Sequence, residues 1–432
     1  MRIFKRFSCG LAVLICAAAF GGCGGGNSEE IKRLDNLVQN FWESDVMYDE
    51  TVILVAPTDA NGEITAMPSG QLLFKADEIM EVKQYFHIDN GGVVKTFAEG
   101  VDFDYADGVI TAKGNVRQDL MGKNTLIDTT MPYVTDRQVK GIDAFPGLTT
   151  STGIPSNEGN WDIPYTESYQ VVQMQLSVTY RHSDTWNKST PVYQGNVLSN
   201  VINKLKAKKK TEILIFGDSI STGANSSSIL NVEPNLAPWY TLMGDKLARH
   251  YGAKVNITNK AVGGWTSSNG VSTSPASGWW NGTQVQQVGL PTLLQTELAD
   301  YSPDLAIIGF GMNDATLGVS LQDYLTNICA MIDALFARNP DCNIILLGTM
   351  LANPQAKDQY KNQTEYSATN ENLARLVYNN EKIACVNIGA MHQDLLDSGK
   401  KYIDMTGNNV NHPNDFIARI YAMNLLSTLI ES

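Results

Sequence analysis

The second half of this sequence alternates short apolar runs with longer amphipathic runs, and this alternation constrains the fold more than any other feature. The predicted strands are Glu212–Phe216, Val255–Thr258, Leu305–Gly309, Ile344–Leu347 and Ile383–Ile388. The predicted helices are Trp239–Tyr251, Val285–Tyr301, Leu321–Arg338, Glu365–Asn380 and Asp415–Ile430. Strands that alternate with helices form a parallel sheet with helices on both faces. We therefore expect an α/β domain over residues 211–432.

A candidate nucleophile follows the first of these strands. The run Thr211–Phe216 ends at Gly217, which allows a sharp turn, and Ser219 comes two residues later. Ligands of open α/β sheets bind at the carboxyl ends of the strands, so a serine here can act as a nucleophile if a base removes its proton. The alternative is an ordinary turn, because Gly, Asp and Ser all favour turns.

Three later stretches favour the catalytic interpretation. They are Asn259–Gly264 after the second strand, Pro303–Asp314 with its Gly-Met-Asn-Asp ending, and Asn411-His412-Pro413 before the last helix. In this order, after Gly-Asp-Ser, they resemble the SGNH (GDSL-type) hydrolase family. The resemblance covers about residues 211 to 432 and implies a flavodoxin-like sheet.

The resemblance also implies a role for each motif residue. Ser219 would be the nucleophile, and His412 would take its proton and later protonate the leaving alcohol. The backbone N–H groups of Ser219 and Gly263 and the side-chain amide of Asn313 would bind the oxyanion. Pro413 suits the first position of a helix, so His412 is expected immediately before the last helix.

The group that orients His412 is left open by the sequence. The family has an Asp three residues before its His, and Asn409 occupies that position here. Asn409 itself, a backbone carbonyl or Asp404 could accept the Nδ1–H of His412. Asp415 is closer in sequence, but its place in the first turn of a helix has an ordinary electrostatic explanation.

A Gly/Ser/Thr-rich stretch from Gly263 to Gly282 contains Trp265, Trp279 and Trp280. Because it starts at an expected oxyanion residue, we predict a loop beside the site, with these tryptophans binding the faces of sugar rings. Packing of the tryptophans onto their own domain is the alternative.

Residues 31–203 predict a β-rich N-terminal domain. A helix is predicted over residues 31–50, followed by short strands that include Thr51–Ala56, Val101–Tyr105 and Tyr169–Tyr180, with an exposed loop at 146–165. This pattern suggests a β-sandwich or jelly roll. It resembles the β-rich N-terminal region of some bacterial SGNH esterases that act on polysaccharides. The lysine-rich segment 204–210 predicts a solvated linker or helix face.

The first 22 residues have the pattern of a signal peptide, with a basic start and the apolar run Leu11–Phe20. Phe20-Gly21-Gly22-Cys23 resembles a bacterial lipobox, and a Gly-rich tether follows at 23–30. We predict lipidation of Cys23 and a location on the bacterial cell envelope. Ordinary signal cleavage between Ala17 and Gly22 is the alternative.

Composition excludes several classes of function. The chain carries 32 basic and 45 acidic residues, and without the three leader cations its net charge is about −16. Such acidity argues against nucleic acid as a partner. Cys329, Cys342 and Cys385 have no paired spacing, and the sequence implies neither a metal nor a cofactor.

Together these features predict a serine esterase that removes acetyl or another small acyl group from a carbohydrate. A lipase or thioesterase of the same family is the alternative among enzymes. A glycan-binding surface lipoprotein with a decayed hydrolase domain is the alternative outside them, and Asn409 is the feature that supports it.

Overall fold

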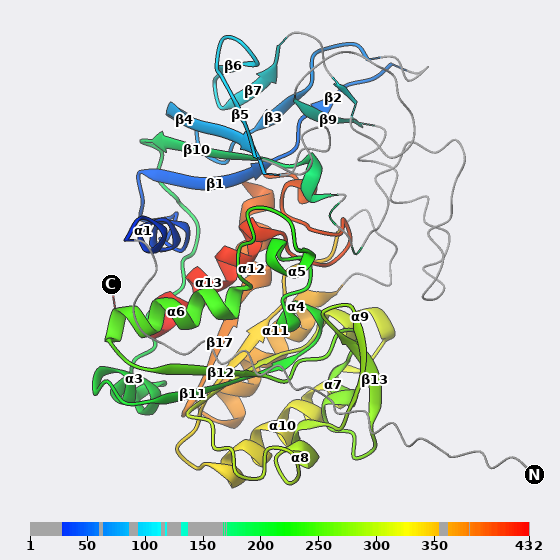
Figure 1. Ribbon diagram of the computed structural model, residues 1–432. Coiled ribbons are helices and arrows are strands. Elements are labelled where there is room, and N and C mark those ends of the chain that lie inside the picture. Colours follow the sequence, from blue (N-terminus) through cyan, green and yellow to red (C-terminus); the bar gives the residue numbers. More distant parts are fainter. Residues whose placement is uncertain are drawn as a thin grey trace, which may run out of the picture.

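The structure is a computed structural model and describes residues 28–59, 64–85, 94–113, 117–118, 131–136, 167, 169, 171–353, 362–379 and 381–431. The predicted signal peptide, Cys23 and the predicted loop at 146–165 lie outside the described residues. Figure 1 shows a β-rich part at the top and an α/β part below it.

Five parallel strands form the central sheet of the α/β part, in the order β12-β11-β15-β16-β17. They are β11 (Thr211–Gly217), β12 (Val255–Asn259), β15 (Leu305–Gly309), β16 (Asn343–Gly348) and β17 (Ile383–Asn387). The predicted parallel sheet is thus confirmed, and the strand order is that of flavodoxin-like folds. In such a sheet the direction of winding reverses between β11 and β15, and ligands bind at that point.

Side chains of the central strands alternate between two cores, as the pleat requires. Ile213 and Ile215 face one core, whereas Leu214 and Phe216 face the other. The first core also contains residues of α3 (Ser199–Lys206), α6 (Trp239–Tyr251), α12 (Ile388–Asp397) and α13 (Asp415–Leu429). The second contains residues of α8 (Leu290–Leu293), α10 (Leu321–Arg338), α11 (Gln363–Asn372) and the π-helical turn η5 (Leu373–Val377). Both faces of the sheet are therefore covered by helices.

The segment between β12 and β15 differs from its prediction. The predicted helix Val285–Tyr301 is wrong, because β14 (Thr283–Gln287) pairs antiparallel with β13 (Ala276–Trp280) before the short α8 begins. Asn281 and Gly282 form the turn with φ of 45° and 75°. An Asn-Gly pair with positive φ at both positions is typical of a two-residue hairpin. The predicted loop Gly263–Gly282 thus contains α7 (Ser267–Gly270) and half of a hairpin.

The lysine-rich segment 204–210 begins as part of a helix, one of the two alternatives that the sequence left open. Residues up to Lys206 complete α3, whose buried Val201, Ile202 and Leu205 join the core beneath the central sheet. Lys204 donates to the carboxylate of Asp304 at 2.6 Å. The helix therefore packs as part of the α/β unit, while residues 206–210 are exposed to solvent.

The N-terminal part begins with α1 (Ser28–Leu37), which is shorter than the predicted helix. The chain enters strand β1 (Val46–Val52) instead of continuing as helix to residue 50, because β1 pairs with β10 (Leu176–His182). The apolar residues at the end of α1 and just after it still pack into the core, since Leu37, Val38 and Phe41 are buried.

Two sheets make up the β-rich part (Figure 1). The antiparallel sheet has the order β1-β10-β4-β5, with β4 at Ala76–Gln84 and β5 at Lys95–Phe97. The mixed sheet has the order β6-β7-β3-β2-β9-β8, with bounds Phe103–Ala106, Val109–Ala112, Ser69–Gln71, Val55–Ala56, Pro132–Thr135 and Arg117–Gln118. Apolar residues of both sheets share one core, among them Val82, Phe97, Ile110 and Tyr133. The more specific prediction of a jelly roll stays a prediction.

The last helix, α13, lies between the two parts and joins them. Nearly all of its side chains are buried, as expected for a helix with protein on every side. Arg419 of α13 donates to the carbonyls of Tyr48 and Asp49, which an irregularity in β1 leaves unpaired with β10. The apolar core on this side of the central sheet is continuous with the core of the β-rich part. The two parts are therefore packed as one body.

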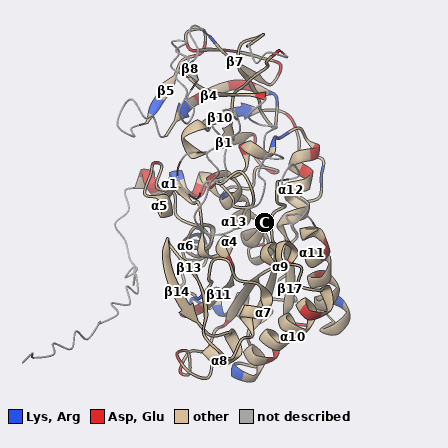
Figure 2. Ribbon diagram, turned by 90° about the vertical axis from the view of Figure 1, so that its right-hand side faces the viewer, with Lys and Arg blue, Asp and Glu red and all other residues tan. Residues whose placement is uncertain are grey.

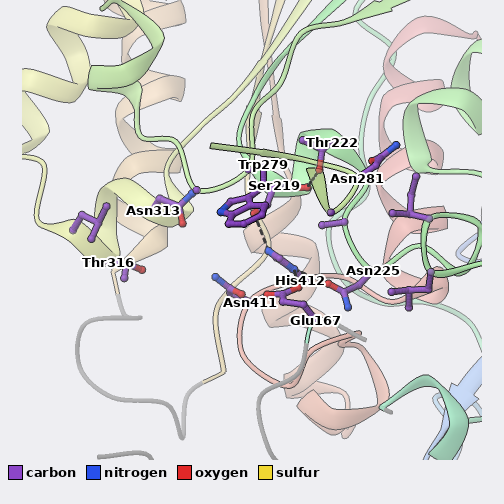
Figure 3. Close-up of a pocket in the computed structure, with 17 residues that line it drawn as sticks. Glu167, Ser219, Thr222, Asn225, Trp279, Asn281, Asn313, Thr316, Asn411 and His412 are labelled. Atoms are coloured by element: carbon purple, nitrogen blue, oxygen red, sulfur yellow. Dashed lines mark hydrogen bonds and ion pairs between the residues drawn. The ribbon is translucent and has the colours of Figure 1, made fainter. Parts of the chain in front are cut away.

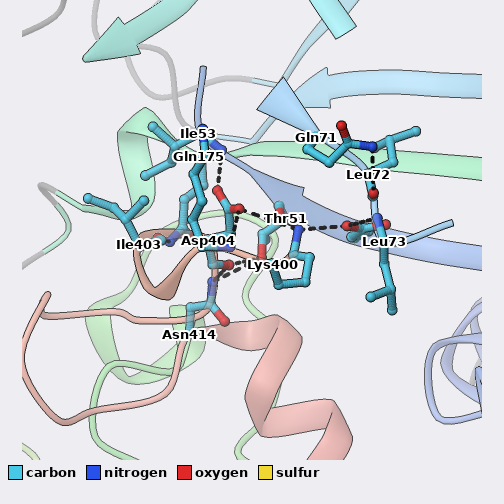
Figure 4. Close-up of polar contacts among 12 residues, drawn as sticks. Thr51, Ile53, Gln71, Leu72, Leu73, Gln175, Lys400, Ile403, Asp404 and Asn414 are labelled. Atoms are coloured by element: carbon cyan, nitrogen blue, oxygen red, sulfur yellow. Dashed lines mark hydrogen bonds and ion pairs between the residues drawn. The ribbon is translucent and has the colours of Figure 1, made fainter. Parts of the chain in front are cut away.

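A buried polar cluster adds to this contact (Figure 4). Lys400 donates to Glu50 at 2.6 Å and to the carbonyl of Thr51 at 2.7 Å. Asp404 accepts the N–H of Ile53 at 2.7 Å. Each of these contacts links β1 or the residue after it to the segment that precedes α13, so the β-rich part is fixed against that segment.

Figure 2 shows Lys and Arg scattered among Asp and Glu over both parts of the molecule. Within the described part of the chain, no helix has both the length and the apolar character needed to cross a bilayer.

Candidate active site

Ser219 is the first residue of the short helix α4 (Ser219–Thr222), directly beyond the end of β11. Asp218 caps this helix by accepting the N–H of Ile220 at 3.0 Å. Gly217 is required before it, because a Cβ at this position would lie 2.2 Å from the carbonyl oxygen of Gly309. The close approach of β11 and β15 thus leaves no room for a side chain at residue 217. Ser219 follows two residues later, at the carboxyl edge of the sheet.

His412 lies against Ser219 (Figure 3), with its Nε2 2.8 Å from the Oγ. The segment that carries His412 is folded around Asn408, whose Oδ1 accepts the N–H groups of Val410, Asn411 and His412 at 2.9 to 3.0 Å. These three hydrogen bonds fix the backbone of the short loop that carries the imidazole of His412. Helix α13 begins at Asp415 with Asn414 as its cap, so Pro413 precedes the helix instead of occupying its first position as predicted.

Two acceptors face the other ring nitrogen of His412. The Oδ1 of Asn225 lies 2.6 Å from Nδ1, and the Oε2 of Glu167 lies 3.0 Å from it. Nδ1 therefore carries the hydrogen, and Nε2 is left as the acceptor that a general base needs. Burial disfavours the charged ring, but the carboxylate of Glu167, with a smaller contribution from Asp218, outweighs burial and raises the pKa of His412.

Asn409 and Asp404, two of the candidates for orienting His412, make their hydrogen bonds elsewhere. The backbone carbonyl of Asn409 accepts from the Nδ2 of Asn353 at 2.9 Å, and its N–H donates to Thr406. Asp404 is held in the polar cluster against β1. The family position fails because Asn409 has a left-handed backbone with φ of 67°. Neither residue contacts the imidazole.

The expected oxyanion donors need one correction. The N–H of Gly263 donates to the carbonyl of Trp279 at 2.7 Å, in a bridge between this loop and the β13–β14 hairpin. The neighbouring Gly264 lines the pocket with φ of 84°, and its N–H has no hydrogen-bond partner among the described residues. The geometry thus favours Gly264 over Gly263 as the backbone donor from this loop.

The other two expected donors, Ser219 and Asn313, line the same pocket. Ser219 is the first residue of its helix, so its N–H has no carbonyl within the helix to bind. Asn313, in α9 (Met312–Leu317), donates one Nδ2 hydrogen to the carbonyl of Trp265 at 2.9 Å. That bond fixes the amide and leaves its second hydrogen for a ligand.

Two buried carboxylates brace this edge of the sheet. Asp314 accepts both the N–H and the hydroxyl of Ser267, at 2.9 and 2.6 Å, and so ties α9 to the Gly264 loop. Burial raises the pKa of Asp314. Burial, with a contribution from nearby Asp314, also raises the pKa of Asp218 to about 7. These carboxylates position the catalytic segments and do not line the pocket.

Only one of the three predicted substrate-binding tryptophans lines the pocket. Trp279 is 53% exposed and borders it. Trp265 is buried, packs edge-on against Phe216 and donates its Nε1–H to Ser277 at 3.0 Å. Trp280 follows Trp279 in β13, so its side chain points to the opposite face of the hairpin. The substrate-binding prediction is therefore wrong for Trp265, which is part of the core, and finds no support in the pocket for Trp280.

The pocket has a volume of about 560 Å³ and combines polar and apolar walls (Figure 3). Apolar side chains come from Ile229 and Leu230 of α5 (Ser227–Leu230) and from Leu317 at the end of α9. Polar groups come from Thr222, Asn281, Thr316 and Asn411. No metal-binding cluster of His, Cys, Asp or Glu occurs in the described ranges.

Sequence reasoning missed Asn225, Asn408, Gly264 and Glu167. Asn225 lies in a turn after α4, and Asn408 is followed by Asn409 and, after Val410, by Asn411; neither position carries a recognised motif. Gly264 was missed by one residue, and only the bridge between Gly263 and Trp279 distinguishes the two glycines. Glu167 is 245 residues from His412 in sequence, so no local pattern could reveal it.

Comparison with known proteins agrees with the motifs of the α/β part. Residues 215–420 match the model of the GDSL-like Lipase/Acylhydrolase family. The chain therefore contains a GDSL-like hydrolase domain, which forms the α/β part. No curated protein matches the chain.

Several solved structures are similar to about half of the chain. A two-domain esterase active on acetylated mannans is 18% identical with a TM-score of 0.39, and the match covers 54% of this chain and 53% of that one. A mutant of an acetylxylan esterase from Geobacillus stearothermophilus is 15% identical with a TM-score of 0.39, covering 51% and 95%. A carbohydrate esterase family 3 protein from Talaromyces cellulolyticus is 14% identical with a TM-score of 0.35, covering 50% and 94%. Similarities this distant do not assign a substrate.

Proposed function

We propose that this protein is a serine ester hydrolase that removes acetyl or a similarly small acyl group from a carbohydrate. The observation that carries the proposal is the 2.8 Å contact between the Oγ of Ser219 and the Nε2 of His412 at the wall of a pocket. The hydrolase domain at residues 215–420 supports the same class of reaction.

In the first half of the reaction, His412 takes the hydroxyl proton of Ser219 as the Oγ attacks the ester carbonyl. The carbonyl oxygen becomes an oxyanion, which the N–H groups of Ser219 and Gly264 and the free Nδ2 hydrogen of Asn313 stabilise. The tetrahedral intermediate then breaks its bond to the alcohol, and the imidazolium gives that alcohol its proton. An acyl group remains on Ser219.

The second half repeats these steps with water. His412 takes a proton from water, whose oxygen attacks the acyl carbonyl, and the same donors stabilise the oxyanion. When the intermediate collapses, the proton returns to the Oγ of Ser219 and the acid leaves. No cofactor is needed for either half, because every proton is carried by His412.

A carbohydrate alcohol is supported by the composition of the pocket walls. Trp279 offers an exposed aromatic face, and Asn281, Thr316 and Asn411 offer hydrogen-bonding groups beside it. This combination suits a sugar, which has apolar ring faces and polar edges.

A lipase or thioesterase activity is the second candidate, and the pocket contains an observation in its favour. Three apolar side chains, those of Ile229, Leu230 and Leu317, line the pocket. A longer acyl chain could bury its methylene groups against them.

A panel of acetylated polysaccharides and p-nitrophenyl esters of increasing chain length separates these candidates, with released acid as the readout. We expect the highest kcat/KM for acetyl esters on carbohydrate, and loss of turnover by more than about 1,000-fold in Ser219→Ala. A fluorophosphonate should label the wild type and spare the variant. Full turnover in a folded Ser219→Ala protein would exclude the serine mechanism. Absence of turnover by the wild-type protein on every ester of the panel would support the binding-protein alternative.

The site of action is proposed from the leader sequence. The basic start, the apolar run and Phe20-Gly21-Gly22-Cys23 support a lipid anchor on Cys23 in a bacterial cell envelope. Fractionation of cells that express Cys23→Ala tests this proposal. The variant should leave the membrane fraction, and continued membrane association would contradict lipidation.

A further inference from the structure

The Nδ1 side of His412 lacks the carboxylate that the family pattern would supply. Asn409 occupies that position and is turned toward Asn353. An amide can accept a hydrogen bond, but it cannot stabilise a developing imidazolium by charge. If the protein catalyses the proposed reaction, another group must supply the negative charge near Nδ1.

We infer that Glu167, from the N-terminal half of the chain, is this group, so that the catalytic Ser–His pair is completed across the two parts of the molecule. The inference rests on the proposed function. Glu167 is a positioning residue: it acts on the substrate only through His412. Its Oε2 lies 3.0 Å from Nδ1, which is hydrogen-bond distance for a charge-assisted contact.

The carboxylate of Glu167 is held at both oxygens. Its Oε1 accepts from the Nδ2 of Asn408 at 3.2 Å, while its Oε2 faces His412. Asn408 is fully buried and also organises the backbone around His412 through its own Oδ1. The same asparagine therefore positions both the imidazole and the carboxylate, so they are aligned as one unit.

Residues 171–175, a few positions after Glu167, are anchored to the loop before His412. A 3-10 turn, η3 (Val172–Met174), leads into Gln175, whose Nε2 donates to the carbonyls of Ile403 and Thr406 at 3.3 and 2.8 Å. Val171 and Met174 pack with Ile403 in a small separate core. These contacts place the chain that carries Glu167 beside the catalytic loop.

Asn225 is the second acceptor, and its role differs from that of Glu167. Its Oδ1 is closer to Nδ1, at 2.6 Å, and its Nδ2 contacts the carbonyl of Gly407 at 3.4 Å. That second contact directs the amide oxygen toward the ring. Asn225 thus fixes the orientation and tautomer of His412, whereas Glu167 adds the charge that favours the imidazolium formed when Ser219 loses its proton.

Partial exposure limits the size of the effect. The side chain of Glu167 is 45% exposed, so water screens its charge more than that of a buried carboxylate. Asn225 also remains as an acceptor when Glu167 is changed. We therefore expect Glu167→Gln to lower kcat/KM by about 10- to 100-fold, less than the loss expected for removal of Ser219.

The pH profile distinguishes a charge effect from a structural one. Among the described residues, the charged groups that act on His412 are Glu167 and Asp218, and both raise its pKa. Because the base is active only when neutral, removal of the Glu167 charge lowers the pKa and moves the acid limb of kcat/KM to lower pH. Asp218 is present in both proteins, so the difference between the two profiles isolates Glu167.

The experiment compares Glu167→Gln, Glu167→Asp and a control on the full chain, with thermal melting to check the fold. Glu78→Gln is the control, because it removes a carboxylate from β4 that contacts Arg181 and does not line the pocket. We expect wild-type kinetics for the control, a lower kcat/KM with a shifted acid limb for Glu167→Gln, and an acid limb closer to wild type for Glu167→Asp, which keeps the charge.

Two outcomes would overturn the inference while leaving the proposed function intact. One is a Glu167→Gln protein with the kinetics of the control, although Ser219→Ala is inactive. The other is a loss of activity in Glu167→Gln without any shift of the acid limb. Full activity of Ser219→Ala would instead refute the proposed function itself.

Discussion

The ammonium of Lys400 lies 2.6 Å from the carboxylate of Glu50, and both side chains are fully buried between the β-rich and α/β parts (Figure 4). Tyr180 donates to the same carboxylate at 2.5 Å, and Asp404 lies 3.6 Å from the ammonium. Burial opposes the charge of Lys400, but Glu50 and Asp404 outweigh it and raise its pKa. The lysine therefore stays charged. The buried charges of the cluster compensate each other only while each partner is present.

Loss of this lysine should destabilise the protein strongly. Lys400→Met keeps the length of the side chain but leaves the carboxylate of Glu50 buried without its cation. We expect the free energy of unfolding to fall by about 3–5 kcal/mol, as measured by urea denaturation. The matched control is Lys113→Met, which breaks a largely exposed pair with Asp104 and should have little effect. Equal stability of the two variants would show that the buried pair does not hold the two parts together.

Asn313→Ala should lower kcat by about 100- to 1,000-fold with little change in KM, because it removes one oxyanion donor that acts mainly in the transition state. Steady-state kinetics on an acetyl ester measure both constants. Asn203→Ala is a suitable control, since it removes an exposed amide from α3. Helix α3 precedes the amino end of β11, whereas the pocket lies at the carboxyl end of that strand. A rise in KM alone would assign Asn313 to ground-state binding instead.

The two tryptophans Trp265 and Trp279 should respond to alanine substitution in opposite ways. Trp265→Ala should lower the free energy of unfolding by about 3–5 kcal/mol, because it leaves a cavity in a packed core beside Phe216. Trp279→Ala should barely change stability but raise KM for a polysaccharide several-fold, because its half-exposed ring borders the pocket. Chemical denaturation and kinetics on both variants check this. An unchanged KM in Trp279→Ala would remove the sugar-stacking role.

The central sheet was predictable because its signals are local. The three inner strands β11, β15 and β16 are almost wholly buried, so they appear in the sequence as short apolar runs such as Ile213–Phe216. The motifs around Ser219 and His412 were recognisable for the same reason, since each occupies a few consecutive residues at a strand end or before a helix. The β13–β14 hairpin also had a local signal in Asn281-Gly282, which the apolar spacing after Val285 obscured.

The remaining features depend on contacts between distant segments, and a single sequence does not specify them. Strand β1 replaces part of a predicted helix because β10, more than a hundred residues later, pairs with it. The partner of His412 could not be found for the same reason, because Glu167 reaches it from the other part of the molecule. The choice between Gly263 and Gly264 depended on a backbone bond to Trp279.

Asn409 provides a separate test of how His412 is held. Its backbone has φ of 67°, a conformation that asparagine tolerates better than alanine, so Asn409→Ala should lower the free energy of unfolding by about 1 kcal/mol. The imidazole, however, contacts Asn225 and Glu167 rather than Asn409. We therefore expect kcat/KM of Asn409→Ala to stay within a few-fold of wild type at temperatures where the protein is folded.

The companion variant Asn409→Asp tests the family position directly. It recreates the Asp-x-x-His spacing, but the left-handed backbone and the contacts with Asn353 direct residue 409 away from the ring. The new carboxylate should therefore leave both kcat/KM and its acid limb close to wild type. Two results would make residue 409 the orienting group. One is a loss of kcat/KM in Asn409→Ala as large as that in His412→Ala. The other is a marked shift of the acid limb of kcat/KM to higher pH in Asn409→Asp. In the present conformation Asn408 holds Glu167, and not residue 409, at the imidazole of His412. Either result would therefore require the segment from Asn408 to His412 to change its conformation during catalysis.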